Sequence, residues 1–305
     1  LHDALPISFR WPSWLNPTWT PDREAELLEF YGGKDTAGWQ HEVAGEHGQP
    51  SFGAFNMTAF HACKKAVPEF RLVTITPEEL EGCDRDEQVR QRFDMLLNLS
   101  PRQGVFWLGI DTGYTNDPSE LVVFHEDEGV AREILRVHGE RVPYPWLSEL
   151  IFVLDLFFEF KGVGIDNGGN GLAVAQELAS LEKFKARGLG DRLKGFDFGG
   201  LTVVGYGEDG KAVKKQTKEY MTSLINGSMQ RRDIAFATAD RQLEEQFATQ
   251  TYTMANGRVT YSKGRDHIID AVRCMALVRE RTEFEKQGTK FIEVFVAPMA
   301  TNPIF

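Results

Sequence analysis

Leu108-Gly-Ile-Asp111-Thr-Gly113 combines an apolar run, an aspartate and a glycine-containing turn. Gly162-Val-Gly-Ile-Asp166-Asn-Gly168 repeats this arrangement further along the chain. Each stretch places a carboxylate at the C-terminal end of a buried strand, which is the edge where open α/β sheets bind ligands. We therefore expect Asp111 and Asp166 to lie near each other at one sheet edge.

A third acidic stretch, Gly264-Arg-Asp266-His-Ile-Ile-Asp270-Ala271, opens an apolar segment. Asp266 and Asp270 are four residues apart, so they share one face of the predicted helix. His267 points elsewhere on this helix and is interpreted as a surface residue. Three separate elements could thus bring carboxylates to one point, as a pair of divalent cations about 4 Å apart requires for phosphodiester hydrolysis.

Each of these aspartates also has an ordinary explanation when it is taken alone. Aspartate often caps backbone amides in turns, and the helix dipole favours it in the first turn of a helix. The combination of Asp111 with Asp166 favours the interpretation as metal ligands. Of Asp266 and Asp270, we expect Asp266 to be the ligand and Asp270 to be a second ligand or a close support.

The overall composition excludes some classes of protein. The 305 residues are 42% hydrophobic and 26% charged, as in an ordinary globular protein, and no apolar run approaches the ~20 residues of a membrane span. The net charge of -11 is unusual for a protein that only grips DNA, but an enzyme that holds cations need not be basic. The three cysteines form no zinc or disulfide pattern, which favours a reducing compartment.

Basic residues that could contact DNA phosphates are few and local. We expect Lys214, Lys215 and Lys218 near the start of a helix, with Lys263 and Arg265 beside the third acidic stretch. Solvated surface positions would explain them nearly as well. The sequence contains no GxxxxGK[ST] phosphate loop.

The order of predicted elements indicates the fold class. Strands over 105–112, 120–125 and 131–137 form an antiparallel meander, and a helix over 146–160 leads to a buried strand over 162–166. This order predicts an α/β protein with an RNase H-like mixed sheet, in which parallel strands follow the meander and helices flank the sheet. Further helices are expected over 20–31, 36–44, 77–97, 172–181, 213–227, 240–248 and 266–281, further strands over 71–76, 201–206 and 291–297, and a hairpin over 250–262 with its turn at Asn256-Gly257.

Taken together, residues 104–281 resemble the nuclease domain of the large terminase subunit of tailed double-stranded DNA phages. The resemblance rests on Gly109-Ile-Asp111 with its following Asp-Pro-Ser, on Ile165-Asp166-Asn167 before Asn-Gly171, and on Asp266-His-Ile-Ile-Asp270-Ala271. In the last motif His267 stands where the family has its second acid. Asn16-Pro17-x-Trp19 and residues 38–46 resemble the end of the terminase ATPase domain.

The resemblance implies a division of the chain into three parts. Residues 9–100 would be the C-terminal part of the ATPase domain and a linker, 101–285 the RNase H-like nuclease domain, and 286–305 a C-terminal tail. Residues 1–8 have no signal-peptide shape and are left out of the fold prediction, and we expect that the chain starts inside a longer protein.

The resemblance also implies an activity: a metal-dependent DNA endonuclease, a hydrolase that cuts concatemeric viral DNA during packaging. Asp111, Asp166, Asp266 and Asp270 would be its catalytic residues and would hold two Mg²⁺ or Mn²⁺ ions. ATP would serve only the full-length protein. The expected partners are double-stranded DNA and, for the full-length protein, the portal and the small terminase subunit, with no membrane, in the host cell cytoplasm and outside the mature virion.

Three alternatives remain open. Gly109-Ile-Asp-x-Gly113 also resembles the first phosphate motif of actin-like and sugar-kinase ATP-binding phosphotransferases, although Asp266 and Asp270 would then have no role. A transposase, integrase or resolvase could have the same fold and the same acids. A non-catalytic DNA-binding or portal-docking module could retain the acids without activity.

Overall fold

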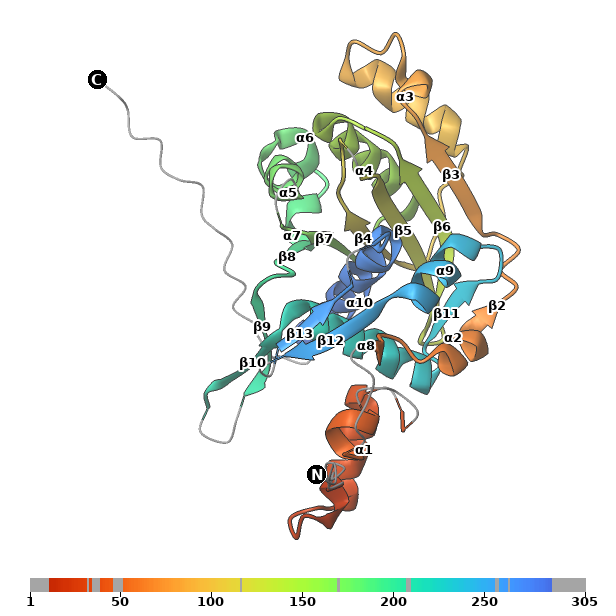
Figure 1. The fold of residues 1–305 in the computed structure, drawn as a ribbon. Helices are drawn as coiled ribbons and strands as arrows, with labels where there is room; N and C mark the ends of the chain where they lie inside the picture. The colour runs from red at the N-terminus through yellow and green to blue at the C-terminus, as the bar shows by residue number, and fades with distance from the viewer. Residues whose placement is uncertain are drawn as a thin grey trace, which may run out of the picture.

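A mixed β-sheet forms the centre of the molecule (Figure 1). The computed structural model describes residues 11–31, 33–34, 39–45, 52–115, 117–168, 171–206, 210–255, 258–262 and 264–286. The sheet has eight strands in the order β2-β11-β6-β5-β4-β7-β8, with β3 also paired to β6. Its strands are β2 (Lys64–Lys65), β3 (Arg71–Ile75), β4 (Val105–Asp111), β5 (Ser119–Asp127), β6 (Val130–Gly139), β7 (Gly162–Asp166), β8 (Leu193–Phe196) and β11 (Ile234–Ala237).

Helices cover both faces of this sheet, and small strands lie outside it (Figure 1). The helices include α1 (Pro21–Tyr31), α2 (Met57–Cys63), α3 (Asp86–Leu97), α4 (Tyr144–Phe158), α5 (Gly171–Ser180), α6 (Glu182–Lys185), α7 (Leu189–Arg192), α8 (Thr217–Arg231), α9 (Arg241–Thr249) and α10 (His267–Lys286), with short turns η1 (Ser13–Leu15), η2 (Trp39–Val43) and η3 (Glu78–Leu80). The outlying strands are β1 (Phe52–Gly53), β9 (Leu201–Tyr206), β10 (Ala212–Gln216), β12 (Thr251–Ala255) and β13 (Arg258–Tyr261).

The expected RNase H-like strand arrangement is confirmed. β4 pairs antiparallel with β5 and β5 with β6, while β7 lies parallel to β4 on its other side and β8 lies parallel to β7. β8 was not predicted, because Leu193-Lys-Gly-Phe196 is short and has none of the β-branched residues that favour strands.

The N-terminal third of the chain contributes to the same sheet. β3 runs parallel to the second half of β6, and β11 runs parallel to its first half and carries β2 on its far side. α3 packs against α4, and Val89, Phe93 and Leu97 of α3 are fully buried in the core between them. The division of the chain at residue 100 stays a prediction, and strands from its N-terminal side extend the sheet.

Alternate residues of β4 face two different hydrophobic cores. Leu108 and Ile110 belong to the core that α3, α4 and α5 share with one face of the sheet. Trp107 belongs to the second core, on the face covered by α8 and α10. Because side chains alternate along a strand, Gly109 and Asp111 also lie on the α10 face. The sheet thus presents the end of β4 to α10.

Several predicted boundaries were wrong for local reasons. The helix predicted over 77–97 is divided into η3 and α3, because the chain between Glu81 and Arg85 leaves the helical conformation. The helix predicted over 213–227 starts only at Thr217. The residues before Thr217, with Lys214 and Lys215, form β10, which pairs antiparallel with β9 in a two-stranded ribbon outside the main sheet (Figure 1).

The hairpin predicted over 250–262 is confirmed as β12 and β13, with β1 paired to β12. Its turn at 256–257, Lys263, the strand predicted over 291–297 and nearly all of the predicted tail lie outside the described residues. In the described part of the helix predicted over 36–44, the chain forms the π-helical turn η2. Of the helices that the structure describes, none combines the length and the apolar character needed to cross a membrane.

Candidate functional site

Glycines on two neighbouring strands let α10 approach the sheet closely. A Cβ atom at Gly109 of β4 would lie 2.0 Å from the carbonyl oxygen of Ala271, and one at Gly164 of β7 would lie 2.2 Å from that of Cys274. Both distances are far below any van der Waals contact, so only glycine permits this helix position. The first two turns of α10, which carry Asp270, are therefore held against β4 and β7.

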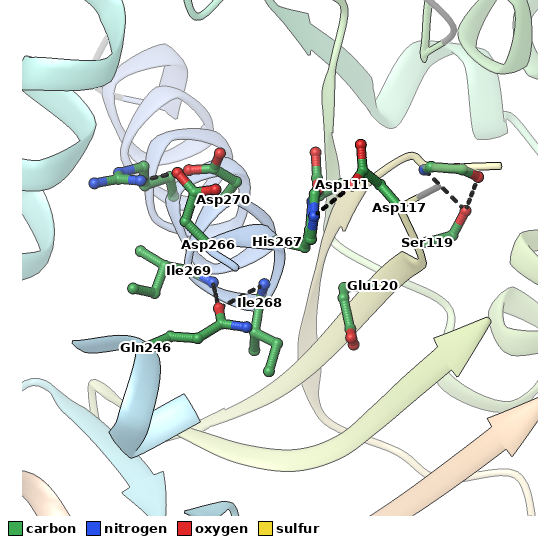
Figure 2. A network of polar contacts seen from close by, with 12 residues as sticks. Asp111, Asp117, Ser119, Glu120, Gln246, Asp266, His267, Ile268, Ile269 and Asp270 are labelled. Carbon is green, nitrogen blue, oxygen red and sulfur yellow. Dashed lines mark hydrogen bonds and ion pairs between the residues drawn. The ribbon is translucent and has the colours of Figure 1, made fainter. Parts of the chain in front are cut away.

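Asp111 ends β4 in a buried position, 7% exposed. Its Oδ2 lies 2.9 Å from Nδ1 of His267, whose Nε2 lies 3.3 Å from Oδ1 of Asp117 (Figure 2). Burial raises the pKa of Asp111 to about 6, with repulsion from Asp270 adding to the effect and His267 opposing it. Its hydrogen bond to Asp111 raises the pKa of His267 to about 9, so the two groups form an ion pair at neutral pH.

The interpretation of His267 as a surface residue was therefore wrong. Its side chain turns into the site and lies between two carboxylates (Figure 2). The loop between β4 and β5 brings Asp117 to it, and Ser119 closes this loop through hydrogen bonds with the backbone N–H and C=O of Gly113. Helix periodicity alone does not reveal such a contact with a distant loop, although the position of His267 between two acids was a signal.

Asp166 ends β7, and its Oδ1 accepts a hydrogen bond of 2.8 Å from the N–H of Gly168. Burial raises the pKa of Asp166 to about 7, and repulsion from Asp111 and Asp270 contributes further. Lys218 opposes this rise. Asp111 and Asp270 thus lie near enough to Asp166 to repel its charge. That the carboxylates of the two strands and the helix form one metal site stays a prediction.

Asp266 and Asp270 form salt bridges with cationic side chains of the protein. Nζ of Lys218 donates to Oδ2 of Asp266 at 3.0 Å and to Oδ2 of Asp270 at 2.8 Å. Arg273, completely buried, donates to Asp270 and to the amide oxygen of Gln250, and Gln250 donates in turn to Asp266 at 2.9 Å. Asp266 does not lie within α10 as predicted: it precedes the helix, and its carbonyl oxygen accepts the N–H of Asp270.

This donor set suits a hard divalent cation. The oxygen ligands of the cation would be the carboxylates of Asp111, Asp166 and Asp270, with Asp266 beside them. These carboxylates repel one another, and a bound cation would reduce this repulsion. As the side chains stand, no three acidic, histidine or cysteine residues among those described are gathered at metal-binding distances. The ammonium of Lys218 supplies positive charge between Asp266 and Asp270.

A cavity of about 820 Å³ opens beside this cluster. Arg265 and His267 line it on the side of α10, and Glu120, His138 and Arg141 line it on the side of β5 and β6. Of the predicted DNA contacts, Arg265 therefore lies at the cavity and Lys218 within the acidic cluster.

The remaining predicted lysines lie on the β9–β10 ribbon or outside the described residues. Lys214 and Lys215 are on the β9–β10 ribbon, where the ammonium of Lys215 lies 3.6 Å from the ring centre of Phe30 in α1. Lys263 is outside the described residues.

No protein-family model matches the chain, and no curated protein is significantly similar to it. Among solved structures, the large terminase from a thermophilic bacteriophage is similar, with a TM-score of 0.51 and 12% identity, over 88% of this chain and 54% of that one. The same protein in complex with ATP-gamma-S gives a TM-score of 0.50 at 12% identity, over 88% and 55% of the two chains.

The large terminase nuclease from thermophilic phage G20c with bound magnesium gives a TM-score of 0.42 at 19% identity, over 62% of this chain and 96% of that one. The two structures of the longer terminase agree with the resemblance seen in the motifs. The chain has the mixed α/β fold of a phage large terminase, and it spans about half the length of the longer terminase that it matches.

Proposed function

We propose that this chain is the endonuclease part of a viral DNA-packaging terminase and cuts concatemeric double-stranded DNA with the help of divalent cations. The observation that carries the proposal is the electrostatic repulsion between acidic residues of β4, β7 and α10: Asp270 contributes to the raised pKa of Asp111, and Asp111 and Asp270 contribute to that of Asp166. Such a cluster is costly in a protein that binds no cation.

Each residue of the cluster has a role that follows from its contacts. Asp111, Asp166 and Asp270, with Asp266, would hold two Mg²⁺ or Mn²⁺ ions. When bound, such ions supply the positive charge that activates water and stabilises the leaving oxygen of a phosphodiester. His267 orients the Asp111 carboxylate through its hydrogen bond of 2.9 Å.

Two cationic residues complete the arrangement. Arg273 fixes the rotamer of Asp270 from the buried side. Lys218 can exchange its carboxylate partners for a DNA phosphate when cations enter.

The wider role of the protein is part of the same proposal. The substrate would be double-stranded DNA, contacted by Arg265 at the cavity and by Lys214 and Lys215 on the β9–β10 ribbon. In a longer protein, an upstream ATPase would use ATP, and the portal and the small terminase subunit would be partners. The site of action would be the cytoplasm of the host cell.

A plasmid-nicking assay with Mn²⁺ tests the proposal, with Asp166→Ala as the decisive variant. Asp197→Ala is a matched control, because Asp197 also follows a parallel strand of the sheet and accepts the N–H of Gly199 at 2.9 Å. We expect Asp166→Ala to reduce nicking by about 10²–10³-fold and Asp197→Ala to leave it unchanged. Undiminished cleavage by Asp166→Ala would exclude this site.

The same preparation distinguishes the alternatives. Tight binding of ATP by this chain, without nicking, would favour an ATP-binding phosphotransferase. A strong preference for branched DNA, or strand transfer, would favour a resolvase or transposase.

A further inference from the structure

The start of α10 departs from the usual way of capping a helix. A helix leaves the N–H groups of its first turn without partners, and an aspartate at the preceding position normally accepts one of them with its carboxylate. Asp266 holds this position, because its carbonyl oxygen accepts the N–H of Asp270 at 2.9 Å. Its carboxylate would therefore be expected on the N–H of Ile268 or Ile269.

A glutamine from another helix makes this cap instead. Oε1 of Gln246 in α9 accepts the N–H of Ile268 at 3.0 Å and that of Ile269 at 3.3 Å (Figure 2). The carboxylate of Asp266 turns the other way, to Lys218 at 3.0 Å and Gln250 at 2.9 Å. The backbone requirement of α10 and the side chain of Asp266 are thus satisfied separately.

Gln246 is held in place from the far end of α9. Asp240 caps α9 through the N–H of Leu243 at 3.0 Å, and its buried carboxylate pairs with Nε of Arg136 on β6 at 2.8 Å. Nη2 of Arg136 also donates to Gln242, one turn before Gln246, at 2.6 Å. α9 is therefore anchored to the sheet independently of the acidic cluster.

From these contacts we infer that Gln246 is a positioning residue: it caps α10 in place of Asp266 and so keeps the Asp266 carboxylate available to the cation site. The effect of Gln246 on the cation site rests on the proposed nuclease function. The capping of α10 by Gln246 does not depend on that function. Without the amide oxygen of Gln246, the Asp266 carboxylate is the nearest replacement cap, and it would leave Lys218 and Gln250 to take that position.

A double-mutant cycle without divalent cations tests the structural part, using Gln246→Met, Asp266→Ala and the combined variant. Gln246→Met keeps the side-chain length and removes the oxygen. In the parent background Asp266 takes over the cap, so the melting temperature changes little. In the Asp266→Ala background no replacement exists, and we expect a further fall of about 2–4 °C. Equal falls in the two backgrounds would overturn the inference.

Nicking with Mn²⁺ tests the functional part on folded variants. We expect Gln246→Met to lose activity roughly tenfold to a hundredfold, and Gln246→Glu to recover most of it, because a carboxylate oxygen accepts the same two N–H groups. Gln91→Met, the same substitution at an exposed position of α3, should retain full activity. Parent-like nicking by Gln246→Met would refute the positioning role. If the parent protein does not nick DNA, the proposed function fails. The melting temperatures of the double-mutant cycle then still test whether Gln246 caps α10.

Discussion

The acidic cluster consists of two pairs of aspartates that the protein treats differently. Asp111 and Asp166, at the ends of β4 and β7, carry pKa values raised by burial to about 6 and about 7. Asp266 and Asp270, at the start of α10, are held by Lys218, and Asp270 also by Arg273. In the strand pair, Asp111 and Asp166, His267 partly offsets the charge of Asp111 and Asp166 stays under electrostatic strain, whereas the helix pair, Asp266 and Asp270, is neutralised in advance.

This difference separates two tasks within one site. A bound cation stabilises most strongly the carboxylates that are costly to ionise. Asp111 and Asp166, the strand pair, therefore supply the driving force for metal binding. A pair already tied to internal cations is oriented before any metal arrives, so the helix pair supplies geometry. The following predictions test this contrast.

The largest effect is expected from Arg273→Met. Arg273 is completely buried, so its removal leaves Asp270 without a main partner and should lower the free energy of unfolding by about 3–5 kcal/mol. Urea denaturation measures the change. Arg231→Met is the control, because Arg231 forms ion pairs at the exposed surface and should cost less than about 1 kcal/mol. Similar losses of unfolding free energy for both variants would mean that Arg273 does not hold Asp270 in place.

A smaller loss is expected from Gly109→Ala, which acts on the distance between the two pairs. The added Cβ would meet the carbonyl of Ala271, so α10 must move away from β4, at about 1–3 kcal/mol. The loss of nicking with Mn²⁺ should be larger than the loss of folded protein accounts for. Gly205→Ala places the same methyl group in open space on β9 and should change neither quantity. Full activity in Gly109→Ala would show that the close approach is unnecessary.

The strand pair predicts a pH effect of a particular sign. Because the pKa of Asp166 rises from 3.8 to about 7 on folding, its stabilising contribution is complete below about pH 3.8 and is lost as the pH rises through 7. Without divalent cations, Asp166→Asn should therefore melt roughly 2–4 °C higher than the parent at pH 8 and show no advantage at pH 4. Calorimetry at the two pH values checks this, with Asp197→Asn as control. An advantage at both pH values would remove the strain argument.

The smallest effect concerns the lysines outside the cluster. Lys214→Ala should weaken DNA binding by less than about tenfold and reduce the salt slope by about one, as the loss of one phosphate contact does. Fluorescence anisotropy at several salt concentrations measures both. Lys218→Met should in addition destabilise the cation-free protein, because Asp266 and Asp270 lose their shared partner. If the two variants behave alike, Lys218 does not hold the helix pair in place.

The strands that carry the strand pair could be predicted because the signal is local. An apolar run that ends in Asp111 or Asp166 before a glycine turn specifies both the strand and the end at which the carboxylate lies. The alternation of side chains along β4 then places Asp111 on the α10 face.

The environment of the helix pair could not be predicted, because it is made of contacts between distant segments. Arg273 and Gln250 carry no motif, yet Arg273 binds both Asp270 and Gln250. His267 was misplaced for the same reason, since Asp117 reaches it from the loop between β4 and β5. Lys214 was assigned to a helix because nothing in the local sequence marks the point where β10 ends and α8 begins.

The pairing of β3 with β6 has a consequence for handling the protein. Arg71–Ile75 covers the backbone of Leu135–Gly139 at the sheet margin. A fragment cut at residue 100 would lack this strand and would expose a row of unpaired N–H and C=O groups in one of the longest strands of the sheet. Exposed strand edges of this kind recruit further chains, so such a fragment should aggregate on expression. A fragment that starts at residue 52 keeps the edge covered and should remain monodisperse.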